Sequence, residues 1–395
     1  MIFEKVSKEE LLKRIESFQL KMQEKGIVTS LIFQNVDIYY FTGTMQKSLL
    51  VIPEKGNFLF FVQKSIERAK IETPFEFEIH PGEQEIANIL KKKGLTKGKI
   101  GMELDILPAS TFTNWQKLLD NTDFVNIYPI IRELRMIKSD YEIEQIKKAG
   151  TIVDHVFKKA KDIIKEGITE LELSATLEYE GRKLGHSGIL RMRGFNQEMD
   201  NITVTHGTSG TITSYADAPI LGAGLCPAVP HGSSLKKIEK YLPILIDYGA
   251  CYNGYVTDET RPFVIEKLDD FFKKPYETTL QIIYKTLEIG REGTNAKDIF
   301  NSANEIVKKA HLEDFFMGYG EGKVFFIGHG IGLEINEFPV ITPKHDITLK
   351  EGMVFAFEPK FIFPQKGVIG IELDFIVRKD KLERVTTTPF ELQIL

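Results

Sequence analysis

The stretch YLPILIDYGACYNGYVTDETRPF, residues 241–263, decides the fold of the second half of this chain. Two apolar runs flank the pair Asn253-Gly254, and both residues of this pair tolerate the positive φ angles of a two-residue hairpin turn. The sequence therefore predicts two antiparallel strands joined at this turn. The turn also fixes the register, because each residue of the first strand pairs with the residue equally far beyond the turn.

Two acidic side chains fall on one face of this predicted hairpin. Asp258 pairs with Gly249, and Asp247 lies on the same face because alternate residues of a strand point to the same side. The two carboxylates become diagonal neighbours, about 7–8 Å apart at their Cα atoms, over a glycine that leaves the space between them open. Carboxylates that converge in this way repel each other unless a proton or a cation lies between them. We interpret the hairpin as one wall of a metal site.

Three residues further along the chain point to the same site. His329 stands between glycines in FFIGHGIGL, residues 325–333, where backbone and ring can approach another group closely. Glu358 and Glu372 lie in two apolar, strand-like runs joined by a turn around Gln365, and this turn places the glutamates directly opposite each other. Two buried carboxylates that face each other are costly without a partner.

Each of these residues has a simpler interpretation when it is taken alone. A histidine in a glycine-rich turn is more often structural than a ligand, and a lone glutamate in a strand is more often exposed or paired with an arginine. The combination of two facing carboxylate pairs and a histidine in one half of the chain favours the metal site.

The composition is that of an ordinary globular protein. The chain has 395 residues, 42% of them hydrophobic and 27% charged, with a net charge of −5. Lys and Arg form no basic stripe, so we expect no nucleic-acid partner. No window approaches the roughly 18 apolar residues of a membrane span, and the N-terminus does not resemble a signal peptide. Two cysteines are typical of a reducing compartment, so we expect a cytoplasmic protein without a membrane partner.

The chain is long enough for two domains. Strand-like and helical runs alternate over the first part, which is typical of an α/β domain, and we find no catalytic arrangement of residues there. The character changes near residue 135, where Ser139 and Glu142 form a capping box ahead of a long amphipathic helix. We place the domains at residues 1–136 and 137–395.

The second domain resembles the creatinase/prolidase/methionine aminopeptidase superfamily, and the whole chain looks like its two-domain Xaa-Pro peptidase branch. The motifs that carry the resemblance are DYG at 247–249, GYVTDETR at 254–261, GHGIGL at 328–333, FEP at 357–359 and IE at 371–372. The resemblance implies an N-terminal creatinase-like α/β domain followed by a C-terminal "pita-bread" α/β domain, whose two pseudo-symmetric halves surround the metals. It also implies two divalent ions held by five ligands: Asp247, Asp258, His329, Glu358 and Glu372.

Four carboxylates and one imidazole form a hard, oxygen-rich ligand set, which suits manganese best and is also compatible with cobalt or zinc. By resemblance, a hydroxide that bridges the two ions attacks the substrate carbonyl, and Glu358 shuttles protons. His231 precedes Asp247 by about the usual interval for a family histidine. We therefore expect His231 to be catalytic and to contact the substrate.

The chain departs from the family pattern at two positions. Asn336 stands where many relatives have a second histidine that helps to position the substrate; asparagine can donate a hydrogen bond but cannot carry charge. Gly370 stands where some proline-specific relatives have an arginine. The segment before Pro230 is also longer than usual, and His206 at its start is a second candidate for substrate contact, although we favour His231.

We therefore expect a dinuclear-metal hydrolase that cleaves the bond before proline in short peptides, as an aminopeptidase or a dipeptidase, and that forms a homodimer. Two alternatives stay open. The first, which Asn336 and Gly370 motivate, is hydrolysis of a non-peptide amide or related C–N bond at the same metal site. The second is a catalytically silent binding protein, although creatine-hydrolysing relatives that work without the metals lack the acidic ligands that this chain keeps.

Overall fold

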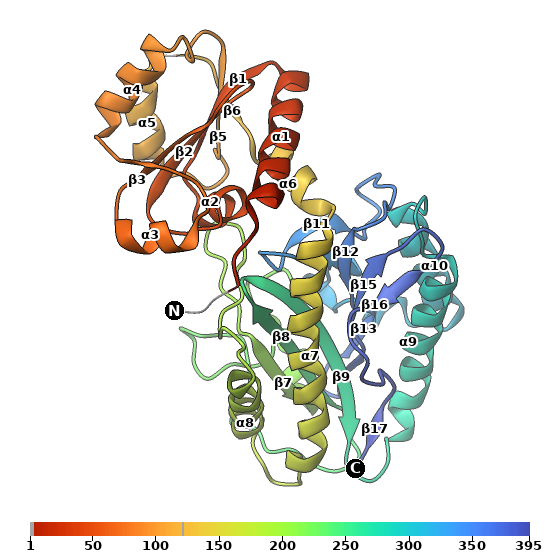
Figure 1. Ribbon diagram of the computed structural model, residues 1–395. Helices are drawn as coiled ribbons and strands as arrows, with labels where there is room; N and C mark the ends of the chain where they lie inside the picture. The colour runs from red at the N-terminus through yellow and green to blue at the C-terminus, as the bar shows by residue number, and fades with distance from the viewer. Residues whose placement is uncertain (1–3, 121) are drawn as a thin grey trace. The chain divides into compact units, whose positions relative to one another are not determined.

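The computed structural model describes residues 4–120 and 122–395, and these form two compact units that divide between Arg135 and Met136 (Figure 1). This division falls next to the expected domain boundary. Both units combine helices with sheets, as the alternating pattern of the sequence predicts.

The first unit is built around a six-stranded mixed sheet with the strand order β4-β3-β2-β1-β5-β6. Its central strand β1 pairs antiparallel with β2 and parallel with β5. The strands are β1 Ile27–Ile32, β2 Ser48–Pro53, β3 Leu59–Val62, β4 Glu78–Ile79, β5 Lys99–Met102 and β6 Phe124–Asn126. The helices are α1 Lys8–Lys25, α2 Asn35–Thr42, α3 Ile66–Glu72, α4 Glu83–Lys92, α5 Ala109–Leu118 and α6 Tyr128–Met136.

The second unit begins with two helices that cover a four-stranded sheet of order β17-β9-β8-β7. In Figure 1 α7 lies along β8 and β9, and its apolar stripe, including Ala149, Val153 and Phe157, is buried in the core between them. The elements are α7 Asp140–Ile163, α8 Glu170–Lys183, β7 Ile202–His206, β8 Ile244–Tyr252, β9 Tyr255–Val264 and β17 Gln393–Ile394.

A second pair of helices covers a five-stranded sheet of order β11-β10-β12-β15-β16. A separate two-stranded hairpin, β13-β14, lies between β12 and β15 in the sequence. The elements are α9 Asp270–Ile289, α10 Ala296–Lys309, β10 Gly328–Gly330, β11 Glu337–Val340, β12 Val354–Phe357, β13 Lys360–Phe363, β14 Gly367–Gly370, β15 Leu373–Val377 and β16 Leu382–Arg384. A sheet covered by two helices thus occurs twice in this unit, as the resemblance implies. The four-stranded sheet is mixed, because β17 pairs parallel with β9, whereas the five-stranded sheet is antiparallel.

Local sequence signals explain where the long helices begin. Ser139 accepts a hydrogen bond from the backbone N–H of Glu142, whose side chain accepts one from the N–H of Ser139, so the predicted capping box is confirmed. Thr169 and Glu172 form the same arrangement at the start of α8.

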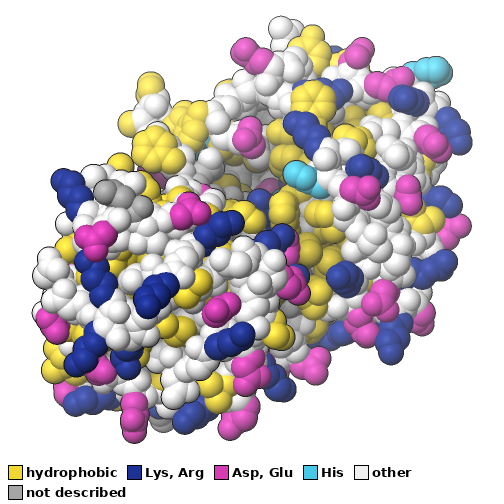
Figure 2. Space-filling model, turned by 90° about the horizontal axis from the view of Figure 1, so that it is seen from above, with side chains coloured by type: hydrophobic (Ala, Val, Ile, Leu, Met, Phe, Trp, Pro, Cys, Tyr) yellow, Lys and Arg dark blue, Asp and Glu magenta, His cyan; other side chains and the backbone are white. Residues whose placement is uncertain are grey.

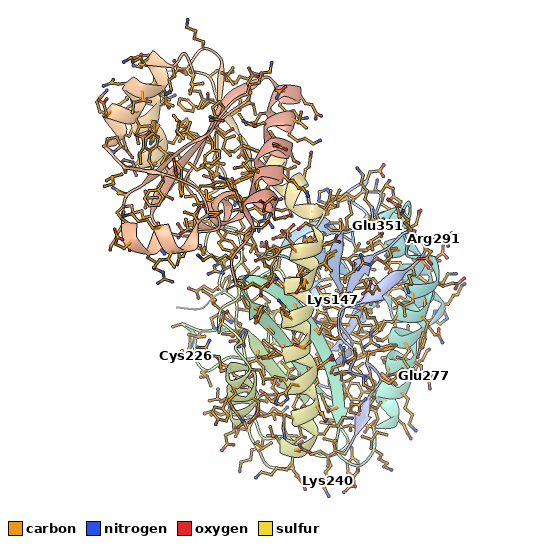
Figure 3. The ribbon with its side chains drawn as sticks, viewed as in Figure 1. Lys147, Cys226, Lys240, Glu277, Arg291 and Glu351 are labelled. Carbon is orange, nitrogen blue, oxygen red and sulfur yellow. The ribbon has the colours of Figure 1, made fainter. Side chains whose placement is uncertain are left out.

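Charged side chains of both signs are mixed on one face of the molecule (Figure 2). Figure 2 shows Lys and Arg interspersed with Asp and Glu on the face that it presents. Figure 3 labels six side chains that project outward, among them Lys147 of α7, which pairs with Glu383. Among the described residues, no helix is both long and apolar enough to cross a membrane.

Candidate metal centre

The β8-β9 hairpin has the predicted register. Gly249 pairs with Asp258 and Asp247 pairs with Thr260, so both aspartates lie on one face of the sheet. The expectation of an open space over Gly249 is wrong, because a Cβ atom at this position would lie 2.4 Å from Cδ1 of Leu190. Leu190 therefore packs on the glycine and covers that part of the hairpin.

The two glutamates face each other, as their register predicts. Lys360 pairs with Gly370 in the β13-β14 hairpin, and Phe357 pairs with Leu373 between β12 and β15. The β12-β15 and β13-β14 strand pairs have the same register. Glu358 and Glu372, which lie between these two strand pairs, therefore stand opposite each other.

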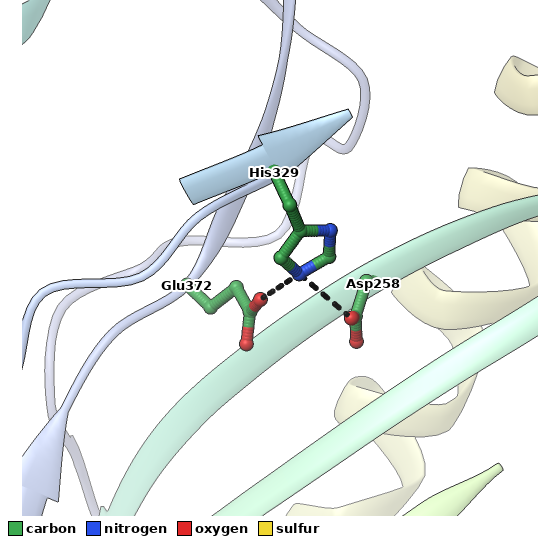
Figure 4. A group of neighbouring side chains, drawn as sticks. All are labelled: Asp258, His329 and Glu372. Carbon is green, nitrogen blue, oxygen red and sulfur yellow. Dashed lines mark ion pairs between the residues drawn. The ribbon is translucent and has the colours of Figure 1, made fainter. Parts of the chain in front are cut away.

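The imidazole of His329 brings the two carboxylate pairs together. His329 lies in β10, which pairs with β12, and its Nε2 atom points between carboxylates (Figure 4). It lies 3.7 Å from Asp258 Oδ2, 3.8 Å from Glu358 Oε1 and 3.9 Å from Glu372 Oε1. These distances are long for hydrogen bonds but suit atoms that share an ion, because an ion bound at about 2.0–2.3 Å holds its ligand atoms roughly 3–4 Å apart.

The electrostatics of the carboxylates favour a cation at this position. Burial, reinforced by the charges of Glu372 and Asp247, raises the pKa of Asp258 well above its usual value. Burial also raises the pKa of Glu372 well above its usual value; Lys360 opposes this rise, and Glu358 and Asp247 add to it. A divalent ion would offset the free-energy cost of ionising these buried carboxylates, because it pairs with their ionised forms.

The structure adds a residue that our sequence analysis did not identify. The Nζ atom of Lys360 lies 2.7 Å from Glu372 Oε2, 2.9 Å from Glu358 Oε2 and 3.2 Å from Asp247 Oδ2. Burial lowers the pKa of this lysine, but the charges of the three carboxylates outweigh burial and hold the pKa well above its usual value. Its position two residues after Glu358 was an available signal, since alternate residues of a strand share a face.

The residues present therefore fit one divalent ion, and the place for a second contains a lysine. Ligand atoms of Asp258, His329 and Glu372 all lie within 4.8 Å of one another, and Oε1 of Glu358 faces His329. Asp247, the fifth predicted ligand, contacts Lys360. The structure thus brings all five predicted ligands together around two positions, one of which the ammonium of Lys360 occupies.

A buried network behind the carboxylates holds their strands. The guanidinium of Arg261 donates to the carbonyl oxygen of Glu372 at 2.7 Å and to Glu259 Oε2 at 2.5 Å. On the other side, Asp374 accepts a hydrogen bond of 2.9 Å from the backbone N–H of Asp258. The hydroxyl of Thr260 donates to Glu372 Oε2 at 2.8 Å. These bonds join β9 to the segment that carries Glu372, so they fix the spacing between ligands from the two halves.

The candidate catalytic histidine has one free ring nitrogen. Nδ1 of His231 lies 3.0 Å from Asp200 Oδ2, which assigns the Nδ1 proton to this bond. Nε2 is buried and has no hydrogen-bond partner among the described residues, and the ring of Tyr215 packs edge-on against the imidazole. A carboxylate that orients a buried imidazole and leaves its second nitrogen free is an arrangement suited to contact with a substrate.

The structure does not support a substrate role for His206. Its Nδ1 lies 3.2 Å from the carbonyl oxygen of Pro243, and its Nε2 accepts a hydrogen bond of 3.0 Å from the backbone N–H of Glu239. Burial lowers the pKa of this imidazole to about 4, and the charge of Lys236 contributes. Both ring nitrogens are hydrogen-bonded to backbone groups, so the imidazole links β7 to the segment at residues 239–243.

Asn336 is likewise engaged by the backbone. Its Oδ1 accepts from the N–H of Arg193 at 2.9 Å, and its Nδ2 donates to the carbonyl oxygen of the same residue at 2.9 Å. The neighbouring N–H of Ile335 donates to the carbonyl oxygen of Arg191. The side chain that we expected to contact substrate therefore fastens the segment around residues 191–193 to the turn after His329.

Comparison with known proteins assigns the family. Residues 144–379 match metallopeptidase family M24, and residues 14–137 match the creatinase/prolidase N-terminal domain. The first match covers more than half of the chain, so the chain belongs to metallopeptidase family M24. The predicted two-domain α/β organisation, creatinase-like followed by metallopeptidase, is confirmed, and so is the expectation of a metal-dependent enzyme.

Named relatives resemble the chain over nearly its full length. It is 30% identical to the Xaa-Pro dipeptidase of Pyrococcus furiosus over 382 residues, which span 96% of this chain and 99% of the relative. The structure of an Xaa-Pro dipeptidase from Bacillus anthracis superposes with a TM-score of 0.83 at 26% identity, covering 98% of this chain and all of that one. An X-Pro aminopeptidase from Thermotoga maritima superposes with a TM-score of 0.77 at 28% identity, covering 96% and 99%.

Proposed function

We propose that this protein hydrolyses the bond before proline in short peptides, using a divalent metal ion. The observation that carries the proposal is the convergence of Asp258, Glu358 and Glu372 on the imidazole of His329 within a chain of family M24. The Xaa-Pro dipeptidases among the relatives supply the substrate class.

The ion-binding residues also define how the reaction can be organised. When bound, a divalent ion polarises a peptide carbonyl and lowers the pKa of a water molecule. Glu358, whose Oε1 lies 3.8 Å from His329 Nε2, would be one of the residues that hold this ion, and its carboxylate could take a proton from the attacking water and pass it to the leaving nitrogen. The bonds from Arg261 and Thr260 keep Glu372 in place while charge develops.

His231 is the second residue that we place in catalysis. With Nδ1 held by Asp200, its Nε2 can bond a polar group of the substrate without first giving up another partner. A group that is fixed before the substrate arrives stabilises developing charge at little cost in reorganisation.

Manganese is the ion that we propose, with cobalt or zinc as substitutes, because carboxylate oxygens dominate the ligand set. The two cysteines, Cys226 and Cys251, are free, which supports a reducing compartment such as the cytoplasm; Cys226, labelled in Figure 3, is exposed. The homodimer remains a prediction.

The two residues that suggested a non-peptide amide substrate no longer support that alternative. It rested on Asn336 and Gly370, and the structure gives each a role within the chain. Asn336 binds the backbone of Arg193. Gly370 leaves room for the side chain of Lys360, since a Cβ at position 370 would lie 2.5 Å from Lys360 Cγ.

Metal-loaded protein should be assayed against Xaa-Pro dipeptides, Xaa-Pro-Xaa tripeptides and matched peptides with alanine in place of proline. We expect turnover of at least one proline series and at most a few per cent of that rate for the alanine series. Preference between the first two series separates a dipeptidase from an aminopeptidase. Absence of turnover in every series, with metal bound, would refute the proposed function.

A further inference from the structure

Lys360 places a cation of the chain itself among the metal ligands. An ammonium has three N–H donors, and the three carboxylate oxygens around its Nζ, at 2.7, 2.9 and 3.2 Å, satisfy all of them. The side chain is only 2% exposed. This lysine is therefore held by the same groups that the family resemblance assigns to metal ions.

The two glutamates bridge two cation positions. Oε2 of Glu358 and Oε2 of Glu372 both contact the ammonium of Lys360. The Oε1 atoms of the same residues lie 3.8 and 3.9 Å from Nε2 of His329. One position is thus lined by Asp258 and His329, and the other contains Nζ of Lys360 beside Asp247.

We propose that Lys360 replaces one of the two ions, so that the centre binds a single divalent ion per chain and the lysine supplies the other positive charge. An ion bound to the same three oxygens at about 2.0–2.3 Å would occupy the space that Nζ fills. The ion and the ammonium exclude each other. The inference deepens the proposed function, since it concerns the metal centre on which that function depends.

Gly370 provides independent support from the opposite strand. Residues 360 and 370 are paired across the β13-β14 hairpin, and a Cβ at position 370 would lie 2.5 Å from Cγ and 2.8 Å from Cα of Lys360. Real Cβ atoms do not come so close to such neighbours. The stem of the lysine therefore crosses space that exists because position 370 has no side chain.

The charge balance agrees with a single ion. Four carboxylates contribute four negative charges and Lys360 contributes one positive charge. One divalent ion leaves a single net negative charge on the cluster. Two ions together with the lysine would leave a net positive charge and would place two cations against one ammonium.

Metal stoichiometry tests the inference directly. Protein stripped with a chelator should be brought to equilibrium with excess MnCl2 by dialysis, and bound manganese measured by mass spectrometry. We expect one equivalent per chain for the wild type and two for Lys360→Ala. The matched control is Lys366→Ala, which removes an exposed lysine from the same hairpin and should leave the value at one. A wild type that binds two ions or none, or a Lys360→Ala protein that still binds one, overturns the inference.

A second measurement needs only the wild type, in case Lys360→Ala does not fold. Electron paramagnetic resonance of the manganese-loaded protein should show the six-line signal of an isolated ion; the multiline signal of two coupled ions would overturn the inference. The outcomes are separable from those for the proposed function. One bound ion without peptide turnover would refute the proposed function and support the inference about Lys360. Two bound ions with peptide turnover would support the proposed function and refute the inference.

Discussion

Replacing Arg261 with methionine should destabilise the second unit far more than the loss of an ordinary ion pair. Arg261 and Glu259 are 0% and 1% exposed and lie 2.5 Å apart. The guanidinium also donates to the carbonyl oxygen of Glu372 and to the hydroxyl of Thr386. Methionine fills similar volume but leaves the carboxylate of Glu259 buried without its cation. Breaking a buried pair in this way costs about 3–5 kcal/mol.

A matched variant separates the effect of burial on stability from the effect of losing an ion pair. Arg378 and Glu383 also form an ion pair, 2.6 Å apart, but their side chains are 25% and 30% exposed. Arg378→Met should therefore cost less than about 1 kcal/mol. The double variant Glu259→Gln/Arg261→Met should recover much of the loss, because it removes the unpaired charge.

Urea unfolding followed by circular dichroism measures these differences. With a slope of about 2–3 kcal/mol per molar urea, Arg261→Met should lower the midpoint of the second unit by roughly 1–2 M. Fluorescence of Trp115, the single tryptophan of the sequence and a core residue of the first unit, follows that unit separately. Equal midpoints for Arg261→Met and Arg378→Met would refute the reasoning that burial makes this ion pair important.

Three further predictions concern the site. Asp258→Asn should weaken manganese binding by at least about 100-fold, since a ligand loses its charge, and should leave the circular dichroism spectrum unchanged. Calorimetric titration measures the affinity for manganese. An affinity equal to that of the wild type would exclude Asp258 as a ligand. His231→Ala should lower kcat by roughly 10²-fold or more with bound metal unchanged, and equal kcat values would remove His231 from catalysis. Asn336→His should lower kcat/KM for Xaa-Pro peptides by loosening the segment at Arg193, and higher activity would show that the histidine restores a substrate contact.

The sequence was sufficient to predict the parts of the site that depend on local register. The Asn253-Gly254 turn is short enough to fix which residues pair, and it predicts the pairing of Asp258 with Gly249 that the structure has. The turn at Gln365 did the same for the two glutamates. In both cases a local conformational preference determines the pairing, and the pairing determines which side chains share a face.

The remaining features depend on contacts between distant segments. The partner of Asn336 is Arg193, 143 positions earlier in the chain, and no local pattern indicates that bond. The packing of Leu190 over Gly249 is of the same kind. The burial of Lys360 is not predictable for another reason, since lysine is seldom buried and an isolated lysine in a strand is normally assigned to the surface.

The hydrogen bond from the backbone of Asp258 to Asp374 joins residues 116 positions apart, and this separation determines when the bond can form during synthesis. Domains generally fold as units during synthesis, the N-terminal domain first. A nascent chain that has completed β9 already carries Asp247 and Asp258, yet it lacks His329, both glutamates and Lys360. These aspartates therefore remain hydrated and cannot bind the ion in its final geometry until the last third of the chain has been translated. The full set of predicted ligands is thus available only near the end of synthesis.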